Sequence, residues 1–164
     1  MKPSISIVLP NRNHAQELQT SLPAILAQTR PADEVVIVED ASADNSLEVI
    51  SNIAKRGKNF RILRNERQLG VAASVRRGVE AARSDFVLLA SADERLAPDA
   101  CATLATAVAS FPQAHLAISL YSEWRPETGE ILVHSRDSEL GMWYVEGAEP
   151  VFVNPGDFRR LLRD

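Results

Sequence analysis

The 164-residue sequence has one cysteine, no long apolar run and little excess charge, and each of these features excludes a class of protein. A single thiol, at Cys101, cannot form an internal disulfide, which favours a reducing, cytoplasmic setting. No apolar stretch reaches the roughly 18 residues that would predict a transmembrane helix, and residues 1–4 lead into a strand pattern without a signal-peptide core. The net charge of −4 gives no support to a nucleic-acid-binding surface.

Glycine is absent from the loop that follows the first predicted strand, which reads Pro10-Asn11-Arg12-Asn13-His14. A Rossmann dinucleotide site needs G-x-G-x-x-G at this place, and the Walker A phosphate loop is missing too, so both common nucleotide fingerprints are excluded. The loop offers side-chain amides and a guanidinium instead. Asn13 is suited either to cap the following helix or to contact a ligand.

Apolar runs and helical periodicities alternate along the first two thirds of the chain. The predicted strands comprise residues 5–9, 35–38, 60–63 and 86–90. The predicted helices comprise residues 15–28, 46–55, 71–82 and 98–110. We expect Pro10 to end the first strand. This alternation predicts an α/β fold with a mostly parallel central sheet and helices on both faces.

The last third of the chain has a different pattern. Residues 116–121 and 131–134 are predicted strands with a turn between them, which indicates a hairpin or an antiparallel addition to the sheet near the C-terminus. A short strand is predicted at residues 151–153, and Pro155 opens a predicted terminal helix.

Two predicted strands are followed by acidic pairs, Glu39-Asp40 and Asp93-Glu94. Because ligands of open α/β sheets bind beyond the carboxyl ends of the strands, these carboxylates could hold a metal ion or a polar ligand. They would repel a bare diphosphate by ~1–4 kcal/mol per close pair of charges, so a phosphate-containing ligand here implies a divalent cation. Each pair alone is also typical of a solvated turn before a helix, and for Asp93-Glu94 alone the solvated turn is the favoured interpretation.

Four segments in this order resemble the family 2 glycosyltransferases, which have the GT-A fold. The family's Pro-Thr-Tyr-Asn corresponds to residues 10–13, and its Asp-Asp-Gly-Ser-x-Asp-x-Ser corresponds to Glu-Asp-Ala-Ser-Ala-Asp-Asn-Ser at residues 39–46. Its Asn-x-Gly-x-x-x-Ala-x-Asn-x-Gly corresponds to residues 68–78, and its Asp-Ala-Asp-Asp metal motif corresponds to Ser-Ala-Asp-Glu at the start of residues 91–98. The resemblance covers roughly residues 4–98.

The resemblance implies transfer of a sugar, with inversion, from a nucleotide-diphosphate sugar to an unidentified glycan, lipid or protein acceptor. It implies one GT-A-like domain over residues 1–164. Residues 1–98 would be its nucleotide-binding part, and residues 99–164 a partial, truncated acceptor side. The expected location is the cytoplasm or the inner face of a membrane.

The same resemblance assigns roles to particular residues. The implied nucleotide-binding set comprises Pro10, Asn11, Asn13, Glu39, Arg76 and Ser91. Within it, Glu39 would hydrogen-bond the base. Asp93 would bind Mg²⁺ or Mn²⁺, which bridges the donor diphosphate and offsets charge on the leaving group.

The chain departs from the family pattern at several of these places. Ser91 replaces the first acid of the metal motif, Glu39 replaces an aspartate, and Arg76 replaces an amide. A carboxylate should act as general base, and the weak candidates are Glu146, Glu149 and Asp157. Two hypotheses stay open: a metal-dependent glycosyltransferase, and a non-catalytic GT-A-like binding or scaffold domain that has lost part of the metal motif and the general base. A nucleotidyltransferase is disfavoured because its Gly-rich loop is absent.

Overall fold

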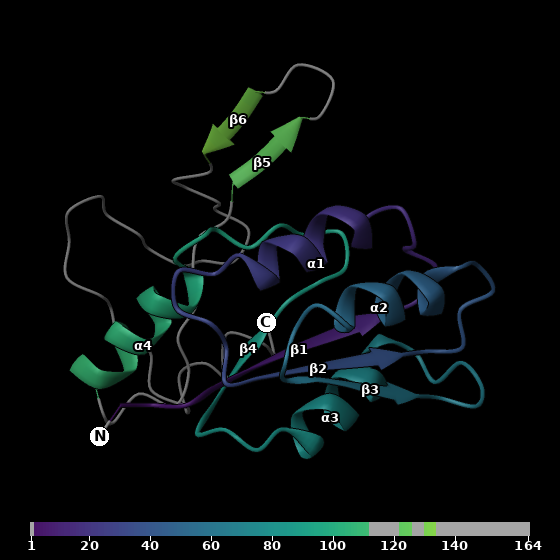
Figure 1. Ribbon diagram of the computed structural model, residues 1–164, viewed down its shortest axis with the longest axis horizontal. Helices are drawn as coiled ribbons and strands as arrows, with labels where there is room; N and C mark the ends of the chain where they lie inside the picture. The colour runs from purple at the N-terminus through teal and green to yellow at the C-terminus, as the bar shows by residue number, and fades with distance from the viewer. Residues whose placement is uncertain (1, 112–121, 126–129, 134–164) are drawn as a thin grey trace, which may run out of the picture. The chain divides into compact units, whose positions relative to one another are not determined.

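The computed structural model describes residues 2–111, 122–125 and 130–133 (Figure 1). The chain divides into two compact units, residues 1–110 and 111–164. The strands predicted at residues 116–121 and 151–153 and the helix predicted from Pro155 lie outside the described residues.

The first unit is built on a four-stranded parallel sheet with helices on both faces (Figure 1). Its strands are β1 (Ile5–Asn11), β2 (Glu34–Glu39), β3 (Phe60–Arg64) and β4 (Phe86–Leu89). They lie in the order β3-β2-β1-β4, so that β3 and β4 are the edges of the sheet. The helices are α1 (Leu18–Leu26), α2 (Ser46–Ala54), α3 (Val71–Ala81) and α4 (Ala100–Ser110). The predicted α/β fold with a mostly parallel sheet is confirmed.

Side-chain alternation along β1 divides the apolar core between the two faces of the sheet. Ile7 and Leu9 pack in a cluster with buried residues of α1, α2 and α4. Val8 lies in a second cluster with Val36 and Val38, on the face that α3 covers. Because the central strands are buried on both faces, they appear in the sequence as unbroken apolar runs.

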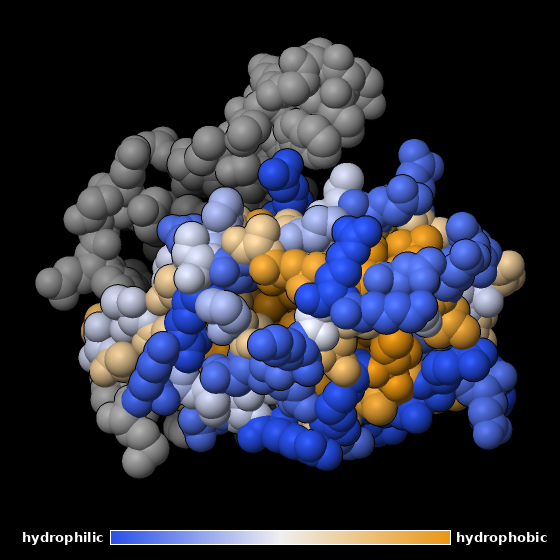
Figure 2. Space-filling model, viewed as in Figure 1, coloured by the Kyte–Doolittle hydropathy of each residue, from blue (hydrophilic) through white to orange (hydrophobic). Residues whose placement is uncertain are grey.

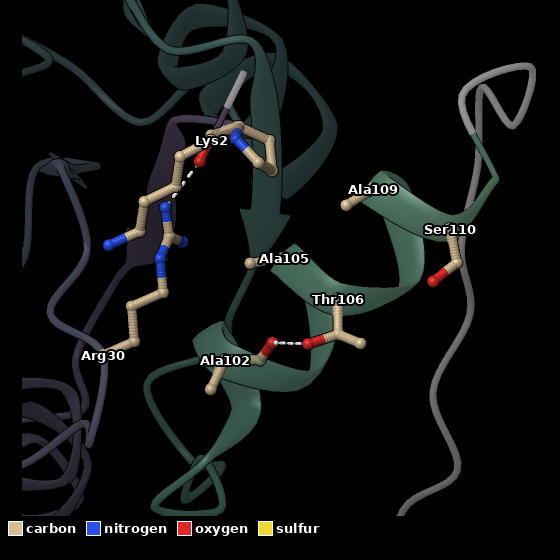
Figure 3. Close-up of a pocket in the computed structure, with 8 residues that line it drawn as sticks. Lys2, Arg30, Ala102, Ala105, Thr106, Ala109 and Ser110 are labelled. Carbon is tan, nitrogen blue, oxygen red and sulfur yellow. Dashed lines mark hydrogen bonds between the residues drawn. The ribbon is translucent and has the colours of Figure 1, made fainter.

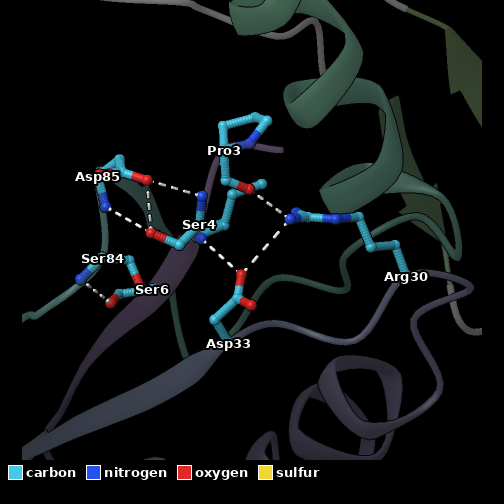
Figure 4. Close-up of polar contacts among 8 residues, drawn as sticks. Pro3, Ser4, Ser6, Arg30, Asp33, Ser84 and Asp85 are labelled. Atoms are coloured by element: carbon cyan, nitrogen blue, oxygen red, sulfur yellow. Dashed lines mark hydrogen bonds and ion pairs between the residues drawn. The ribbon is translucent and has the colours of Figure 1, made fainter. Parts of the chain in front are cut away.

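Polar contacts tie the strands together at the amino edge of the sheet (Figure 4). Ser4 Oγ donates to the Asp85 carboxylate at 2.7 Å, and Asp85 N donates to Ser4 Oγ at 2.9 Å. The Asp33 carboxylate accepts from Ile5 N at 2.8 Å. These contacts join the segments before β1, β2 and β4, and they support the register that also positions the opposite, carboxyl edge.

The structure corrects the prediction that Pro10 ends the first strand, because β1 continues through Pro10 to Asn11. The pairing of β1 with β4 ends at Val8 and Leu89, and the Val8 carbonyl accepts from Ala90 N. Pro10 has the same orientation as Val8, so its missing N–H lies beyond the end of this ladder. Proline is tolerated in a sheet where no ladder hydrogen bond is lost.

The described part of the second unit is a hairpin. Strands β5 (Ser122–Arg125) and β6 (Glu130–Val133) pair antiparallel and form a sheet of their own. Strand β6 overlaps the strand predicted at residues 131–134. An antiparallel addition to the four-stranded sheet stays a prediction.

Within residues 2–111, 122–125 and 130–133, no helix has the length and apolar character that crossing a membrane requires.

Candidate functional site

A pocket of about 210 Å³ lies at the carboxyl edge of the sheet, beyond the ends of β1, β2 and β4. Its lining consists of Pro10, Asn11, Arg12, His14, Asp40, Gln68, Gly70, Val71, Ser74 and Ser91. A larger, shallow recess of about 530 Å³ lies near the amino end of β1, where Lys2 and Arg30 face the alanines of α4 (Figure 3). Ligands of open α/β sheets bind at the carboxyl edge, so the smaller pocket is the candidate site.

Asn11, the last residue of β1, brings a buried amide to this pocket. Asn11 is 2% exposed, and its Nδ2 donates to Ser42 Oγ at 3.3 Å. Its Oδ1 is buried and has no hydrogen-bond partner. A buried acceptor without a partner is rare and destabilising in a folded protein, so Asn11 Oδ1 is available to a ligand that carries an N–H or O–H group.

Asn13 connects the loop after β1 to the loop after β2. Asn13 N donates to Ser42 Oγ at 3.0 Å, and Asn13 Oδ1 accepts from Ala43 N at 2.7 Å. Asn13 does not cap α1, because that helix begins at Leu18, its N-cap residue is Glu17, and no side chain makes a capping hydrogen bond there. The capping interpretation of Asn13 is therefore wrong, and its side chain instead braces the mouth of the pocket.

The same two loops contain both non-glycine residues that have a positive φ among the described residues: 57° at Asn13 and 53° at Ala41. This left-handed conformation costs alanine about 1–2 kcal/mol, whereas asparagine adopts it at a smaller cost. The family pattern has glycine at the place of Ala41, and the observed φ gives the physical reason. The mutual hydrogen bonds of Asn13 hold this strained turn in place.

Asp40 fixes the loop that leads into α3. Its carboxylate accepts from Asn65 Nδ2 at 2.6 Å, Leu69 N at 2.8 Å and Gly70 N at 2.8 Å. Gly70 has a φ of 90°, which favours glycine at this place. Burial alone would raise the pKa of Asp40, but these hydrogen bonds outweigh it and lower the pKa below its ordinary value. Asp40 is thus an ionised structural anchor at the wall of the pocket.

Glu39 lies next to Asp40 but has a different role. It is 3% exposed, and its Oε1 accepts from Ser42 N at 2.8 Å. Glu39 does not line the pocket, although its partner in the β1–β2 register, Asn11, does line it. The carboxylate predicted to read the base therefore closes the turn after β2, one residue from the pocket wall.

Ser91 and Asp93 follow β4 on the other side of β1. Ser91 lines the pocket, and its hydroxyl donates to the Asp93 carboxylate. Asp93 is exposed, and the hydrogen bond from Ser91 lowers the pKa of Asp93, with a smaller contribution from nearby His14. Asp93 is therefore ionised at neutral pH and accessible to a cation at the rim of the pocket.

Arg76 and Arg77, adjacent on α3, point in different directions. The Arg76 side chain is 77% exposed, pairs with Glu80 at 3.8 Å, and does not line the pocket. Arg77 donates to the backbone carbonyl of Arg64 at 2.8 Å and to the side chain of Asn65. Arg76, a member of the implied nucleotide-binding set, thus lies outside this pocket lining, and Arg77 braces the loop that Asp40 also holds.

Sequence reasoning did not name His14, Gln68, Gly70, Val71 or Ser74 as candidate site residues, although all of them line the pocket. An available signal was position in the family motifs, because His14 directly follows the segment 10–13 and the other four residues lie within the segment 68–78. The packing of α3 on the sheet is what brings Ser74 to the pocket. The general-base candidates Glu146, Glu149 and Asp157 lie outside the described residues.

The fold and pocket define an open α/β domain that presents a ligand pocket at the carboxyl ends of its parallel strands, as in the GT-A fold. The family description "Glycosyl transferase family 2" matches residues 6–142. The chain belongs to this family.

Two relatives show how much of a family member the chain represents. EpsH of Bacillus subtilis (strain 168), named as a glycosyltransferase, is 28% identical over 151 residues, which cover 92% of this chain and 42% of EpsH. The poly-beta-1,6-N-acetyl-D-glucosamine synthase of Staphylococcus epidermidis (strain ATCC 35984) is 29% identical over 96 residues, which cover 58% of this chain and 23% of the synthase. The chain spans less than half the length of these relatives.

Solved structures share the fold. Residues 1–349 of Staphylococcus aureus TarS, in complex with UDP-GlcNAc, match with a TM-score of 0.63 and 18% identity over 73% of this chain and 38% of that one. The mannosyltransferase PcManGT from Pyrobaculum calidifontis, in complex with GDP-Man and Mn²⁺, matches with a TM-score of 0.61 and 24% identity over 77% of this chain and 37% of that one. Both likenesses identify the fold as GT-A.

Proposed function

We propose that the chain is the nucleotide-sugar-binding part of an enzyme that transfers a sugar, with inversion, from a nucleotide-diphosphate sugar to an acceptor. The observation that carries the proposal is the polar pocket at the carboxyl edge of β1, in a chain that belongs to family 2. Two structures with the same fold bind UDP-GlcNAc and GDP-Man, which supports this class of donor. Residues 1–98 would bind the nucleotide, and residues 99–164 would begin the acceptor side.

The nucleoside would lie against the loop after β1, between Pro10, Asn11 and Asn13. Asn11 Oδ1 is the buried acceptor without a partner, and it suits an N–H group of the base. Glu39 would assist through the carboxylate oxygen that does not accept from Ser42 N. The Ser91 hydroxyl, at the opposite wall, suits a ribose hydroxyl.

A divalent cation fits this site only if the protein and the donor diphosphate hold it together. Within the described parts of the chain, no group of three or more acidic, histidine or cysteine side chains could hold a metal ion. The Asp40 carboxylate is occupied by three donors, which leaves Asp93 as the available hard ligand. Mg²⁺ is commonly held by one or two carboxylates together with substrate phosphates. A cation bound by Asp93 and the diphosphate would offset charge on the leaving nucleoside diphosphate.

The first prediction concerns binding of the donor. A UDP-sugar or GDP-sugar with Mn²⁺ should raise the unfolding midpoint by several degrees, because a ligand at 100 times its Kd stabilises the native state by about 2.7 kcal/mol. A thermal-shift assay on the full chain, with and without the cation, measures this. No shift with any common nucleoside diphosphate sugar at millimolar concentration would contradict the proposal.

The second prediction concerns the metal. Asp93→Ala should abolish the Mn²⁺-dependent part of that shift, and Ser91→Asp should strengthen it by adding a second carboxylate. Glu94→Ala is the matched control, because this exposed neighbour lies outside the pocket lining. A Mn²⁺ dependence that persists unchanged in Asp93→Ala would remove Asp93 from the site.

The second candidate function is a non-catalytic GT-A-like binding or scaffold domain. The hydrogen bond from Ser91 to Asp93 favours it, because this bond engages a carboxylate oxygen where the family pattern has a second acid. A binding domain would show the thermal shift but would release no nucleoside diphosphate from the sugar donor. An assay for free UDP or GDP, with and without candidate acceptors, separates the two functions.

A further inference from the structure

Helix α3 turns small side chains toward the sheet and larger apolar ones toward solvent. Ser74 and Gly78 are buried, whereas the side chains of Val71 and Val79 are 71% and 42% exposed. Val75 lies between these two valines at a spacing of four residues and is partly buried. A helix on the surface of a globular domain ordinarily has the reverse arrangement. Contact with a binding partner would therefore remove the outer valines of α3 from water.

The segment that contains this helix is rich in basic residues. Residues 55–83 contain nine lysines and arginines and two glutamates, although the whole chain has a net charge of −4. The exposed members of this set are Lys55, Arg56, Lys58, Arg64, Arg67, Arg76 and Arg83. Arg61 donates to Ala81 O at 2.8 Å and Arg77 donates to Arg64 O at 2.8 Å, which holds β3 beside α3. Figure 2 shows apolar surface in the region of β3, bordered by hydrophilic residues.

We propose that this surface, the outer valines of α3 with the exposed Arg64 and Arg67 that precede this helix, docks on an anionic lipid bilayer. Charge complementarity selects the partner, because an excess of cations interleaved with apolar side chains matches anionic headgroups above acyl chains. Among the described residues, Arg64 and Arg67 have no carboxylate within ion-pair distance. Their charges are therefore available to a lipid headgroup.

Magnitudes favour a bilayer over a protein partner. Lysine and arginine side chains near an anionic membrane add affinity without shape complementarity, so the exposed and unpaired Arg64 and Arg67 suit a layer of anionic headgroups. A stable protein complex buries roughly 1,200–2,000 Å² of well-packed surface, which one convex helix face with a few exposed valines does not offer.

The docking surface adjoins the candidate donor pocket, because Val71 belongs to both. Docking would place the mouth of the pocket beside the lipid headgroups. This step rests on the proposed function: if the chain transfers a sugar, the acceptor would be carried by a lipid.

Flotation of the full chain with vesicles tests the docking, and no nucleotide sugar is needed. We expect binding to vesicles of phosphatidylcholine and phosphatidylglycerol in equal amounts, and none to phosphatidylcholine alone. Binding should be lost in about 1 M NaCl, where the Debye length is about 3 Å. The R64E/R67E variant should weaken binding at least 10-fold, and V71S/V79S several-fold.

Two variants on other parts of the chain serve as matched controls. Leu89→Ser removes a side chain that is 53% exposed on the opposite edge strand, and Lys2→Glu reverses an exposed charge before β1; both should bind vesicles as the unchanged chain does. No binding to anionic vesicles at low salt, equal binding to neutral vesicles, or unchanged binding of R64E/R67E and V71S/V79S would overturn the proposal. If a variant fails to fold, the lipid and salt dependence of the unchanged chain decides the question. A negative result leaves the proposed sugar transfer untouched, because that function is tested by nucleotide-sugar binding.

Discussion

Replacing Asp40 with alanine should lower the free energy of unfolding by about 3–5 kcal/mol. The carboxylate accepts from Asn65 Nδ2, Leu69 N and Gly70 N at 2.6, 2.8 and 2.8 Å, and Asp40 is only 3% exposed. Alanine would leave Leu69 N and Gly70 N without their acceptor, would remove one of the two acceptors of Asn65 Nδ2, and would free the loop that leads into α3. Urea unfolding followed by circular dichroism measures the difference.

The Asp40 carboxylate also predicts a dependence on pH. Its pKa is lowered in the folded state from the ordinary 3.8, so the unfolded chain takes up the proton first as pH falls. The stabilisation is fully present above about pH 4 and is lost as pH falls through the lowered, folded-state pKa. The stability of the unchanged chain should therefore fall more steeply in this acid range than that of Asp40→Ala.

Glu66→Ala is the matched control, because Glu66 is an exposed carboxylate in the same loop. We expect it to change the free energy of unfolding by less than about 0.5 kcal/mol. If Asp40→Ala were as mild as Glu66→Ala, the three hydrogen bonds would not be what holds the loop. A nucleotide-sugar thermal shift that survived in a folded Asp40→Ala protein would separate the anchoring of the loop from ligand binding.

The strands and helices of the first unit could be predicted because they depend on local patterns. Continuous apolar runs such as that of β2 indicate strands buried on both faces, and apolar residues spaced three or four apart indicate α1 and α2. The end of β1 could not be predicted, because proline is excluded from a ladder only where a neighbouring strand needs its N–H. Whether β4 extends past Pro10 is a fact of tertiary structure and not of the sequence around Pro10.

The candidate site could be predicted as a place but not as a set of contacts. Parallel strands bring their carboxyl ends to one edge, so the proximity of Asn11, Asp40 and Ser91 followed from topology alone. Glu39 closes the turn after β2 and Asp40 holds the loop before α3. These different roles depend on which backbone N–H groups each turn directs at the two carboxylates. The sequence does not specify those turns, and the positive φ of Ala41 runs against its residue type.

Replacing Gly78 with alanine should destabilise the protein by about 1–3 kcal/mol, although alanine is the better helix former by about 1 kcal/mol. A Cβ at this place would lie 2.4 Å from Val8 Cγ1 and 3.1 Å from Val38 Cγ2. Both valines are fully buried in central strands, so neither can move aside cheaply. Gly78 thus permits α3 to lie close to the sheet, which also sets the position of Ser74 at the pocket.

A double-mutant cycle with Val8→Ala tests this steric explanation. Val8→Ala should destabilise through the cavity it leaves, and the added methyl of Gly78→Ala should partly fill that cavity. The double variant should therefore be more stable than the sum of the two single effects by at least about 1 kcal/mol. Ala72→Gly at an exposed position of α3 is the control, because it changes helix propensity alone and should show no coupling with Val8→Ala. Coupling near zero between Gly78 and Val8 would mean that backbone freedom at Gly78, and not the close approach of α3 to β1, determines the need for glycine.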